Sequence, residues 1–239
     1  MEYVLHKANS RGFANHGWLK THHTFSFANY YDPGRVHFGA LRVLNDDEVD
    51  GAKGFDTHPH DNMEIVSIPL EGELRHKDSM GNLAIIKEGE VQVMSAGTGI
   101  YHSEYNNKHD KPVKFLQIWV FPNKKNVTPR YDQIVYKKED LKNNFLQIVS
   151  PDENDEGVWV YQDTWFYLSE MDKDKSMKYD MKRSGDGLYV FVLEGNIEVN
   201  GINLSERDGI GIWDTDKINF RAITGTRVLL MEVPMLSEK

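Results

Sequence analysis

Cysteine is absent from the 239-residue sequence. Disulfide bonds, thiolate metal ligands and cysteine nucleophiles are therefore excluded. Long apolar segments are also missing, because no run approaches the roughly 18 residues that a membrane-spanning helix requires. Residues 1–7 (MEYVLHK) lack the basic and then apolar pattern of a secretory signal. These absences predict a cytoplasmic protein that does not associate with a membrane.

Positive charge is in short supply. The sequence has 28 lysines and arginines against 37 aspartates and glutamates, which gives a formal net charge of −9. Because nucleic acids attract proteins mainly through their phosphate charge, this balance argues against direct nucleic-acid binding. The hydrophobic content of 39% is ordinary for a globular protein, and the length suffices for one large β domain or two small ones.

Histidine is confined to the first half of the chain, since all ten histidines precede residue 110. His58 and His60 are two residues apart, and so are His102 and Glu104. In a β-strand that spacing places both side chains of a pair on one face. Two such strands brought together in a barrel would direct three imidazoles and a carboxylate to one point. The sequence therefore predicts a metal site.

The donor set narrows the choice of metal. Neutral imidazole suits iron, nickel, copper and zinc, and a carboxylate adds a hard donor and negative charge. We expect one mononuclear divalent transition metal, with iron(II) as the first candidate and nickel, copper, manganese and zinc as alternatives. Glu64 shares a face with His58 and His60 if their strand continues. Spacing alone therefore leaves Glu64 and Glu104 both open as the carboxylate ligand.

Several other polar residues carry weaker expectations. His22, His23 and His37 could orient the metal ligands through hydrogen bonds, or could simply pack and cap elsewhere. His76 lies among charged residues and is expected to face solvent. Residues 45–53 (NDDEVDGAK) are expected to form an acidic surface loop.

Short apolar segments separated by turn residues recur about every 8–12 residues, which is typical of a β-sandwich or barrel. Two of these segments are echoed later in the chain. Residues 67–74 (SIPLEGEL) resemble 190–197 (VFVLEGNI), and residues 88–94 (EGEVQVM) resemble 208–214 (DGIGIWD). Residues 122–129 have a proline at each end and look like a boundary. We therefore expect an all-β protein with two antiparallel barrel domains, residues 1–125 and 126–239.

The repeat also bears on the chemistry. The two matched segments lie 123 and 120 residues apart. At these offsets the positions that correspond to the four candidate ligands hold Met181, Arg183, Ala222 and Thr224. If the repeat is real, only the first copy holds metal ligands.

Two motifs resemble those of a known superfamily. Residues 54–72 resemble the histidine-rich motif of the cupins, and residues 89–106 resemble its companion motif. The second motif departs from the usual pattern, because Ser95 replaces proline and four residues rather than two separate Gly97 from His102. This longer gap, with Glu104 following and with segments 11–19 and 23–33, resembles the pirin family in particular. The matching motifs cover residues 11–131, and beyond them only the two-barrel layout matches.

The resemblance implies a bicupin, with a metal-binding cupin (pirin) domain followed by a cupin-like domain that lacks metal ligands. The family's ligands match His58, His60, His102 and Glu104, which favours Glu104 over Glu64. The resemblance is greatest to bacterial pirin-like proteins with quercetin 2,3-dioxygenase activity, which open the central ring of a flavonol with O₂ and release carbon monoxide. Glu104, or Glu64 if it is not a ligand, would then be the catalytic residue that accepts the flavonol hydroxyl proton.

Two other functions are compatible with the same residues. Pirins are also regarded as non-enzymatic, metal- and redox-responsive regulators that bind a protein partner. A sugar-binding or isomerising cupin would need a convergent set of lysine, arginine or threonine side chains, and the sequence shows no clear set. An apolar cavity large enough for a flavonol at the open metal position would favour the dioxygenase over the regulator.

Overall fold

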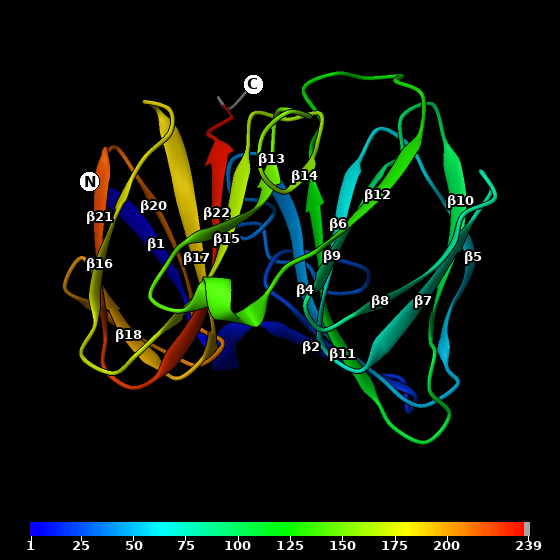
Figure 1. Cartoon of the computed structure of the whole chain (residues 1–239), viewed down its shortest axis with the longest axis horizontal. Coiled ribbons are helices and arrows are strands. Elements are labelled where there is room, and N and C mark those ends of the chain that lie inside the picture. Colours follow the sequence, from blue (N-terminus) through cyan, green and yellow to red (C-terminus); the bar gives the residue numbers. More distant parts are fainter. Residues whose placement is uncertain (237–239) are drawn as a thin grey trace.

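The computed structural model describes residues 1–236. Nearly all of its regular structure is β-strand, arranged as two barrels side by side (Figure 1). Each barrel consists of one seven-stranded and one four-stranded sheet. The prediction of an all-β protein with two antiparallel barrels is thus confirmed. Within residues 1–236, no helix has the length and apolarity needed to cross a membrane.

The N-terminal barrel contains the candidate ligands. Its larger sheet has the order β12-β9-β6-β11-β4-β3-β2 and its smaller sheet the order β5-β10-β7-β8. The strands of the larger sheet are β2 (Gly12–Asn15), β3 (Leu19–His23), β4 (Leu41–Val49), β6 (Glu64–Glu71), β9 (Glu90–Ser95), β11 (Val113–Val120) and β12 (Arg130–Val135). Those of the smaller sheet are β5 (Gly54–His60), β7 (Glu73–Asp78), β8 (Leu83–Lys87) and β10 (Ile100–Asn106).

The C-terminal barrel has the orders β1-β20-β17-β22-β15-β13-β14 and β16-β21-β18-β19. The strands of its larger sheet are β1 (Glu2–His6), β13 (Leu146–Ser150), β14 (Val158–Trp159), β15 (Trp165–Met171), β17 (Asp186–Glu194), β20 (Gly209–Trp213) and β22 (Thr226–Pro234). Those of its smaller sheet are β16 (Ser176–Asp180), β18 (Asn196–Val199), β19 (Ile202–Ser205) and β21 (Lys217–Ala222). The short 3₁₀ helices are η1 (Ala8–Ser10) and η2 (Lys138–Leu141).

The two barrels repeat one another strand by strand. The order β9-β6-β11-β4 corresponds to β20-β17-β22-β15, and β5-β10-β7-β8 corresponds to β16-β21-β18-β19. The hairpins β6–β7 and β17–β18 both turn at a glycine with positive φ, Gly72 (84°) and Gly195 (80°). A Cβ on Gly195 would lie 2.2 Å from the backbone oxygen of Gly225, so only glycine fits that turn. The duplication predicted from the sequence echoes is confirmed.

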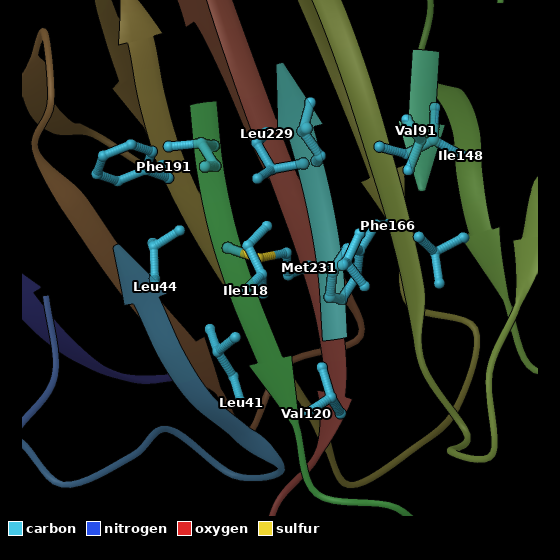
Figure 2. Close-up of a cluster of buried hydrophobic side chains, with 14 of the residues drawn as sticks. Leu41, Leu44, Val91, Ile118, Val120, Ile148, Phe166, Phe191, Leu229 and Met231 are labelled. Carbon is cyan, nitrogen blue, oxygen red and sulfur yellow. The ribbon is translucent and has the colours of Figure 1, made fainter. Parts of the chain in front are cut away.

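The two large sheets pack face to face and share one apolar core (Figure 2). The first sheet supplies side chains such as Leu44 and Ile118, and the second supplies Phe166, Leu229 and Met231; all five are fully buried. Because strand side chains alternate between faces, the residues between these core positions point away from the interface. In the N-terminal barrel that second face looks into the barrel interior.

Two strands lie across the domain boundary expected from the sequence. Strand β1 pairs with β20 in the C-terminal barrel, and β12 pairs with β9 in the N-terminal barrel. The division of the chain at residue 125 stays a prediction. Through these pairings each part of the chain contributes one strand to the barrel formed mainly by the other part.

The acidic surface loop expected at residues 45–53 is wrong for residues 45–49, and only residues 50–53 form a turn between strands. Strand β4 continues to Val49 and pairs with β3 on one side and β11 on the other. Asn45 and Asp47 are buried, with 2% and 4% of their surface exposed. The strand is polar because these side chains line a cavity inside the barrel rather than solvent.

Candidate metal centre

The three candidate histidines meet between the adjacent strands β5 and β10. His102 lies directly opposite His58 in the antiparallel register, and His60 lies opposite Ile100. The ring centroids are 4.4 Å apart for His58 and His102, and 4.9 Å apart for the two pairs that include His60. One nitrogen from each ring lies within 4.8 Å of one from each of the others. Spacing of two along each strand has therefore brought three imidazoles together, as the sequence predicted.

Glu104 lies deeper than the histidines. Its side chain is fully buried, and its carboxylate accepts hydrogen bonds from Ser67 Oγ at 3.2 Å and from Gln117 Nε2 at 2.7 Å. A carboxylate oxygen lies within 4.8 Å of nitrogens of His102 and His76. Burial raises the pKa of Glu104 to about 7, although the two hydrogen bonds oppose this rise. Glu104 thus lies beside His102, and its carboxyl group gains or loses a proton near neutral pH.

Glu64 points away from the histidines. Its carboxylate accepts a hydrogen bond from Ser95 Oγ at 2.7 Å. In β6 it shares a face with Val66, which belongs to the core between the barrels, whereas Ser67 reaches Glu104 from the opposite face. The structure therefore places Glu104, and not Glu64, next to His102 and His76.

His76 was expected to face solvent, and this prediction is wrong. It lies on β7, opposite Glu104 of β10, and its side chain is fully buried. Its Nε2 lies 3.1 Å from Asp78 Oδ2, and its Nδ1 lies 3.5 Å from His102 Nδ1. Leu74, two residues earlier and buried on the same face, was the sequence signal that could have set the inward phase of this strand.

These contacts define which nitrogens carry protons. Asp78 accepts from His76 Nε2–H, so His76 Nδ1 is left as an acceptor for His102 Nδ1–H. His102 Nε2 then carries a lone pair. That nitrogen is buried and has no hydrogen-bond partner in the described part of the chain. Such an orphaned atom costs about 1–3 kcal/mol, and a bound cation would satisfy it.

The other two imidazoles are also suited to binding a cation. His58 Nδ1 donates to the backbone oxygen of Asp56 at 2.7 Å, which leaves its Nε2 free. Burial lowers the pKa of His60 to about 4 and that of His102 to about 2. Metal binding requires neutral imidazole, so the rings are ready ligands at pH 7. Three unprotonated nitrogens and a nearby carboxylate fit a transition metal.

A cavity of about 520 Å³ leads to His58 and His60. Its walls are mainly apolar and aromatic, and Trp119 meets His60 edge to face with ring centroids 4.9 Å apart. The aromatic and large aliphatic side chains that line it are Phe13, Leu19, Phe27, Tyr30, Phe55 and Trp119. This volume is in the range of sites that bind small organic ligands.

The remaining histidines singled out in the sequence make other contacts. His23 Nδ1 lies 2.9 Å from Asn45 Oδ1, and His37 Nδ1 lies 2.9 Å from the backbone oxygen of Gly39. The ring of His22 packs on Phe13 at 4.8 Å. The histidine that does contact a candidate ligand is His76, which the sequence reasoning missed.

Comparison with known proteins gives the family. The model of the family described as Pirin matches residues 5–120, and that of the quercetinase C-terminal cupin domain matches residues 147–233. The chain is 44% identical over 230 residues to quercetin 2,3-dioxygenase of Escherichia coli strain K12, covering 96% of this chain and 98% of that protein. The chain belongs to the pirin family. The resemblance predicted from its motifs is confirmed.

Two further pirin relatives agree with this placement. A putative quercetin 2,3-dioxygenase of Pseudomonas aeruginosa is 40% identical over 223 residues, covering 93% of this chain and 95% of that protein. The crystal structure of the bacterial pirin YhhW from Escherichia coli in complex with nickel(II) matches with a TM-score of 0.93 and 42% identity. That match covers 98% of this chain and all of the other.

The second barrel has no histidines at the positions equivalent to the candidate ligands. Its interior is filled by a tightly packed apolar cluster that includes Leu188, Ile210, Ile218 and Phe220. The predicted match of Ala222 to His102 is wrong: Ala222 pairs with Ile197 on β18 as Asn106 pairs with its echo Leu74 on β7, so Ala222 corresponds to Asn106. Ile218 and Phe220 of this apolar cluster stand in the register positions of His102 and Glu104. The polar interior of the first barrel and the apolar interior of the second show how one fold has been filled in two ways.

Proposed function

We propose that this pirin is a metal-dependent dioxygenase that opens the central ring of a quercetin-like flavonol with O₂ and releases carbon monoxide. The observation that carries the proposal is the aromatic cavity of about 520 Å³ that leads to His58 and His60. A flat, largely apolar ligand of flavonol size matches both its volume and its walls. The names of the two relatives above support the same activity.

His58, His60, His102 and Glu104 would hold one divalent transition metal. Iron(II) is the first candidate, and nickel, copper, manganese and zinc are the alternatives that this donor set also accepts. The nickel complex of the related pirin supports a metal at this site without identifying the one used here. When bound, such a metal supplies Lewis acidity and a route for electron transfer to O₂.

Glu104 would also accept the flavonol hydroxyl proton. A general base works best when its pKa lies near the working pH, and burial raises that of Glu104 to about 7. Ser67 and Gln117 hold the carboxylate in one orientation from the floor of the barrel. Removal of this proton makes the flavonol ring electron-rich, which is the form that reacts with O₂.

The cavity walls would position the substrate and exclude water. Trp119 lies between His60 and Phe27 and meets both rings edge to face, at 4.9 and 5.3 Å between centroids. A flavonol inserted beside these rings would lie flat against them and present its hydroxyl to the histidines. This cavity favours the enzyme over the regulator, because a regulator that signals through its surface needs no such cavity at its metal.

Oxygen uptake tests the proposal. Protein loaded anaerobically with iron(II) is given quercetin in an oxygen electrode, and carbon monoxide is measured in the gas phase. We expect uptake that depends on quercetin and is lost in His58→Ala, with retention in His109→Ala, which removes an exposed loop histidine. Stoichiometric metal binding without uptake, with iron and with each of the alternative metals, would contradict the proposal.

A further inference from the structure

The cavity contains a buried carboxyl group, one oxygen of which has no hydrogen-bond partner among the described residues. Asp47 lies on β4, lines the cavity and is 4% exposed. Its Oδ1 has no hydrogen-bond partner among the described residues, and the side chain forms no ion pair with them. Its acidic neighbour Asp46, by contrast, pairs with Arg11 at 3.2 Å. A buried acceptor left without a donor is costly unless a ligand or water supplies one.

Asp47 is part of a compact polar square. In the antiparallel register of β3 and β4, Thr21 lies opposite Asp47 and His23 lies opposite Asn45. Residues two apart on each strand share a face, so all four side chains point into the barrel. The Thr21 hydroxyl is also buried and without a partner in the described chain. His23 and Asn45 satisfy one another at 2.9 Å, which leaves the Thr21 hydroxyl and the Asp47 carboxyl group side by side at the cavity.

The square adjoins the candidate metal centre. Gln117, whose amide donates to Glu104, lies opposite Asn45 on the next strand, β11. Neighbouring strands are about 5 Å apart. A ligand of two or three rings in this cavity can therefore contact the histidines and the polar square at the same time.

The charges around the cavity restrict what can bind there. Among the described residues that line it there is no lysine or arginine. Burial raises the pKa of Asp47 to about 7, a rise that the Thr21 hydroxyl opposes and the nearby carboxylates of Asp46 and Glu104 support. An anionic group would find no positive partner here. A neutral hydroxyl would find an acceptor at Asp47 and a second hydroxyl at Thr21.

We propose that Asp47, together with Thr21, forms a hydroxyl-binding subsite that selects substrates with a phenolic hydroxyl on a ring other than the one that reacts. Asp47 Oδ1 accepts the phenolic hydrogen, and Thr21 holds the same oxygen. The subsite thus makes hydroxylated flavonols better substrates than unsubstituted ones. This inference rests on the proposed dioxygenase function and names the feature of the substrate that the site recognises.

Two substrates and three variants test the subsite. Quercetin carries ring hydroxyls, whereas 3-hydroxyflavone carries only the hydroxyl of the central ring. The readout is the ratio of kcat/KM for quercetin to that for 3-hydroxyflavone. In Asp47→Leu we expect this ratio to fall by about 10- to 100-fold, because a hydrogen bond to a buried charged group is lost. Asp47→Asn keeps an acceptor oxygen and should restore most of the ratio.

Glu48→Gln is the matched control. Glu48 follows Asp47 on the same strand, faces the other side of the sheet and pairs with exposed Lys20. Its removal should leave the ratio unchanged. An unchanged ratio in Asp47→Leu, or an equal loss on both substrates, would overturn the proposal, since either result makes Asp47 a structural residue only.

Binding without turnover separates this inference from the proposed function. Quenching of tryptophan fluorescence in zinc-loaded protein gives the affinity for each flavonol in the absence of O₂. If the protein binds quercetin more tightly than 3-hydroxyflavone, and Asp47→Leu abolishes that preference, the subsite holds even if no metal gives turnover. Equal affinities in the native protein would overturn the subsite while leaving the dioxygenase activity to its own test.

Discussion

Single side chains in this pirin are oriented by hydrogen-bond partners that spacing along the sequence does not reveal. His102 presents Nε2 to the candidate metal position because His76 accepts from its other nitrogen, and His76 is fixed in turn by Asp78. The chain of contacts runs from a carboxylate through two imidazoles to the site. Partners of this kind set the tautomer and orientation of a ligand.

Replacing His76 should weaken metal binding. His76→Leu leaves His102 Nδ1–H without its acceptor, so the ring loses its fixed tautomer, and we expect affinity for cobalt(II) or nickel(II) to fall about 10- to 100-fold. Competition with a chelator measures it, and the visible spectrum of bound cobalt(II) reports the geometry. Tyr131→Phe is the control, because the ring that packs on His76 at 4.8 Å remains. Equal affinity and an identical spectrum in His76→Leu would refute the role.

The buried Glu64 should give the metal-free protein a measurable pH dependence. Burial raises the pKa of Glu64 from 4.5 to about 7. Between these values the folded state binds more protons than the unfolded state, so the free energy of unfolding falls as the pH rises through this window. Glu64→Gln removes this contribution. On going from pH 4.5 to pH 8, the free energy of unfolding of the variant should rise relative to that of the native protein by up to about 3 kcal/mol.

Urea unfolding of chelator-treated protein at the two pH values measures this difference. Glu48→Gln, which removes a carboxylate at the surface, supplies the comparison. A stability difference between Glu64→Gln and the native protein that stays constant with pH would show that burial does not raise the pKa of Glu64 in the folded state.

At the scale of elements, the site depends on how β5 and β10 meet. Their register shifts between His102 and Glu104, since His102 lies opposite His58 whereas Glu104 lies opposite Phe55. This bulge adds one residue to β5. As a result, Glu104 lies deeper in the barrel than the histidines. Bulges next to functional sites commonly re-aim side chains in this way.

Gly54 lets the two strands approach beyond the bulge. A Cβ at this position would lie 2.2 Å from the backbone oxygen of Glu104 and 2.5 Å from Tyr105 Cα. Gly54→Ala must therefore push β5 away from β10, and we expect a loss of about 1–3 kcal/mol in stability together with weaker metal binding. Gly225→Ala is the control, because a Cβ there meets nothing within 4 Å. Native stability and affinity in Gly54→Ala would contradict this account of the strand contact.

The elements also show what the sequence could and could not predict. Pairs at spacing two made His58, His60, His102 and Glu104 the candidate ligands, and both pairs do lie in strands, whose period is two. Spacing could not choose between Glu64 and Glu104, because the chain leaves the strand between β5 and β6, where Asn62 adopts a φ of 45° and resets the phase. That choice needed the fold or the family.

The sequence-based predictions also failed for buried residues in polar strands. Asp47 resembled a loop residue because Asp46 and Glu48 flank it, and His76 resembled a surface residue because Arg75 and Lys77 flank it. In each case the flanking charges occupy the outer face and the residue between them faces the barrel. The burial of such residues is set by distant strands, β3 and β11 for Asp47 and β10 for His76. A local pattern cannot report it.

At the scale of the molecule, the two barrels differ in role: the second contributes apolar burial, and the first contains the candidate metal centre. The second barrel buries an apolar cluster in its interior and offers its large sheet to the core shared with the first barrel. Strand β1, at the start of the chain, completes the sheet of the second barrel. The first barrel can therefore keep a polar, hollow interior, because much of the stabilising burial lies elsewhere.

Isotope labelling tests the central claim most directly. The metal-loaded protein is given quercetin under ¹⁸O₂, and the products are analysed by mass spectrometry. Ring opening by a dioxygenase inserts both atoms of O₂ into the ring-opened ester and releases the carbon between the cleaved bonds as carbon monoxide. The account predicts two labelled atoms in the ester, one molecule of unlabelled carbon monoxide per O₂ consumed, and neither product with His58→Ala. Consumption of quercetin with one labelled atom or none, or without carbon monoxide, would contradict it.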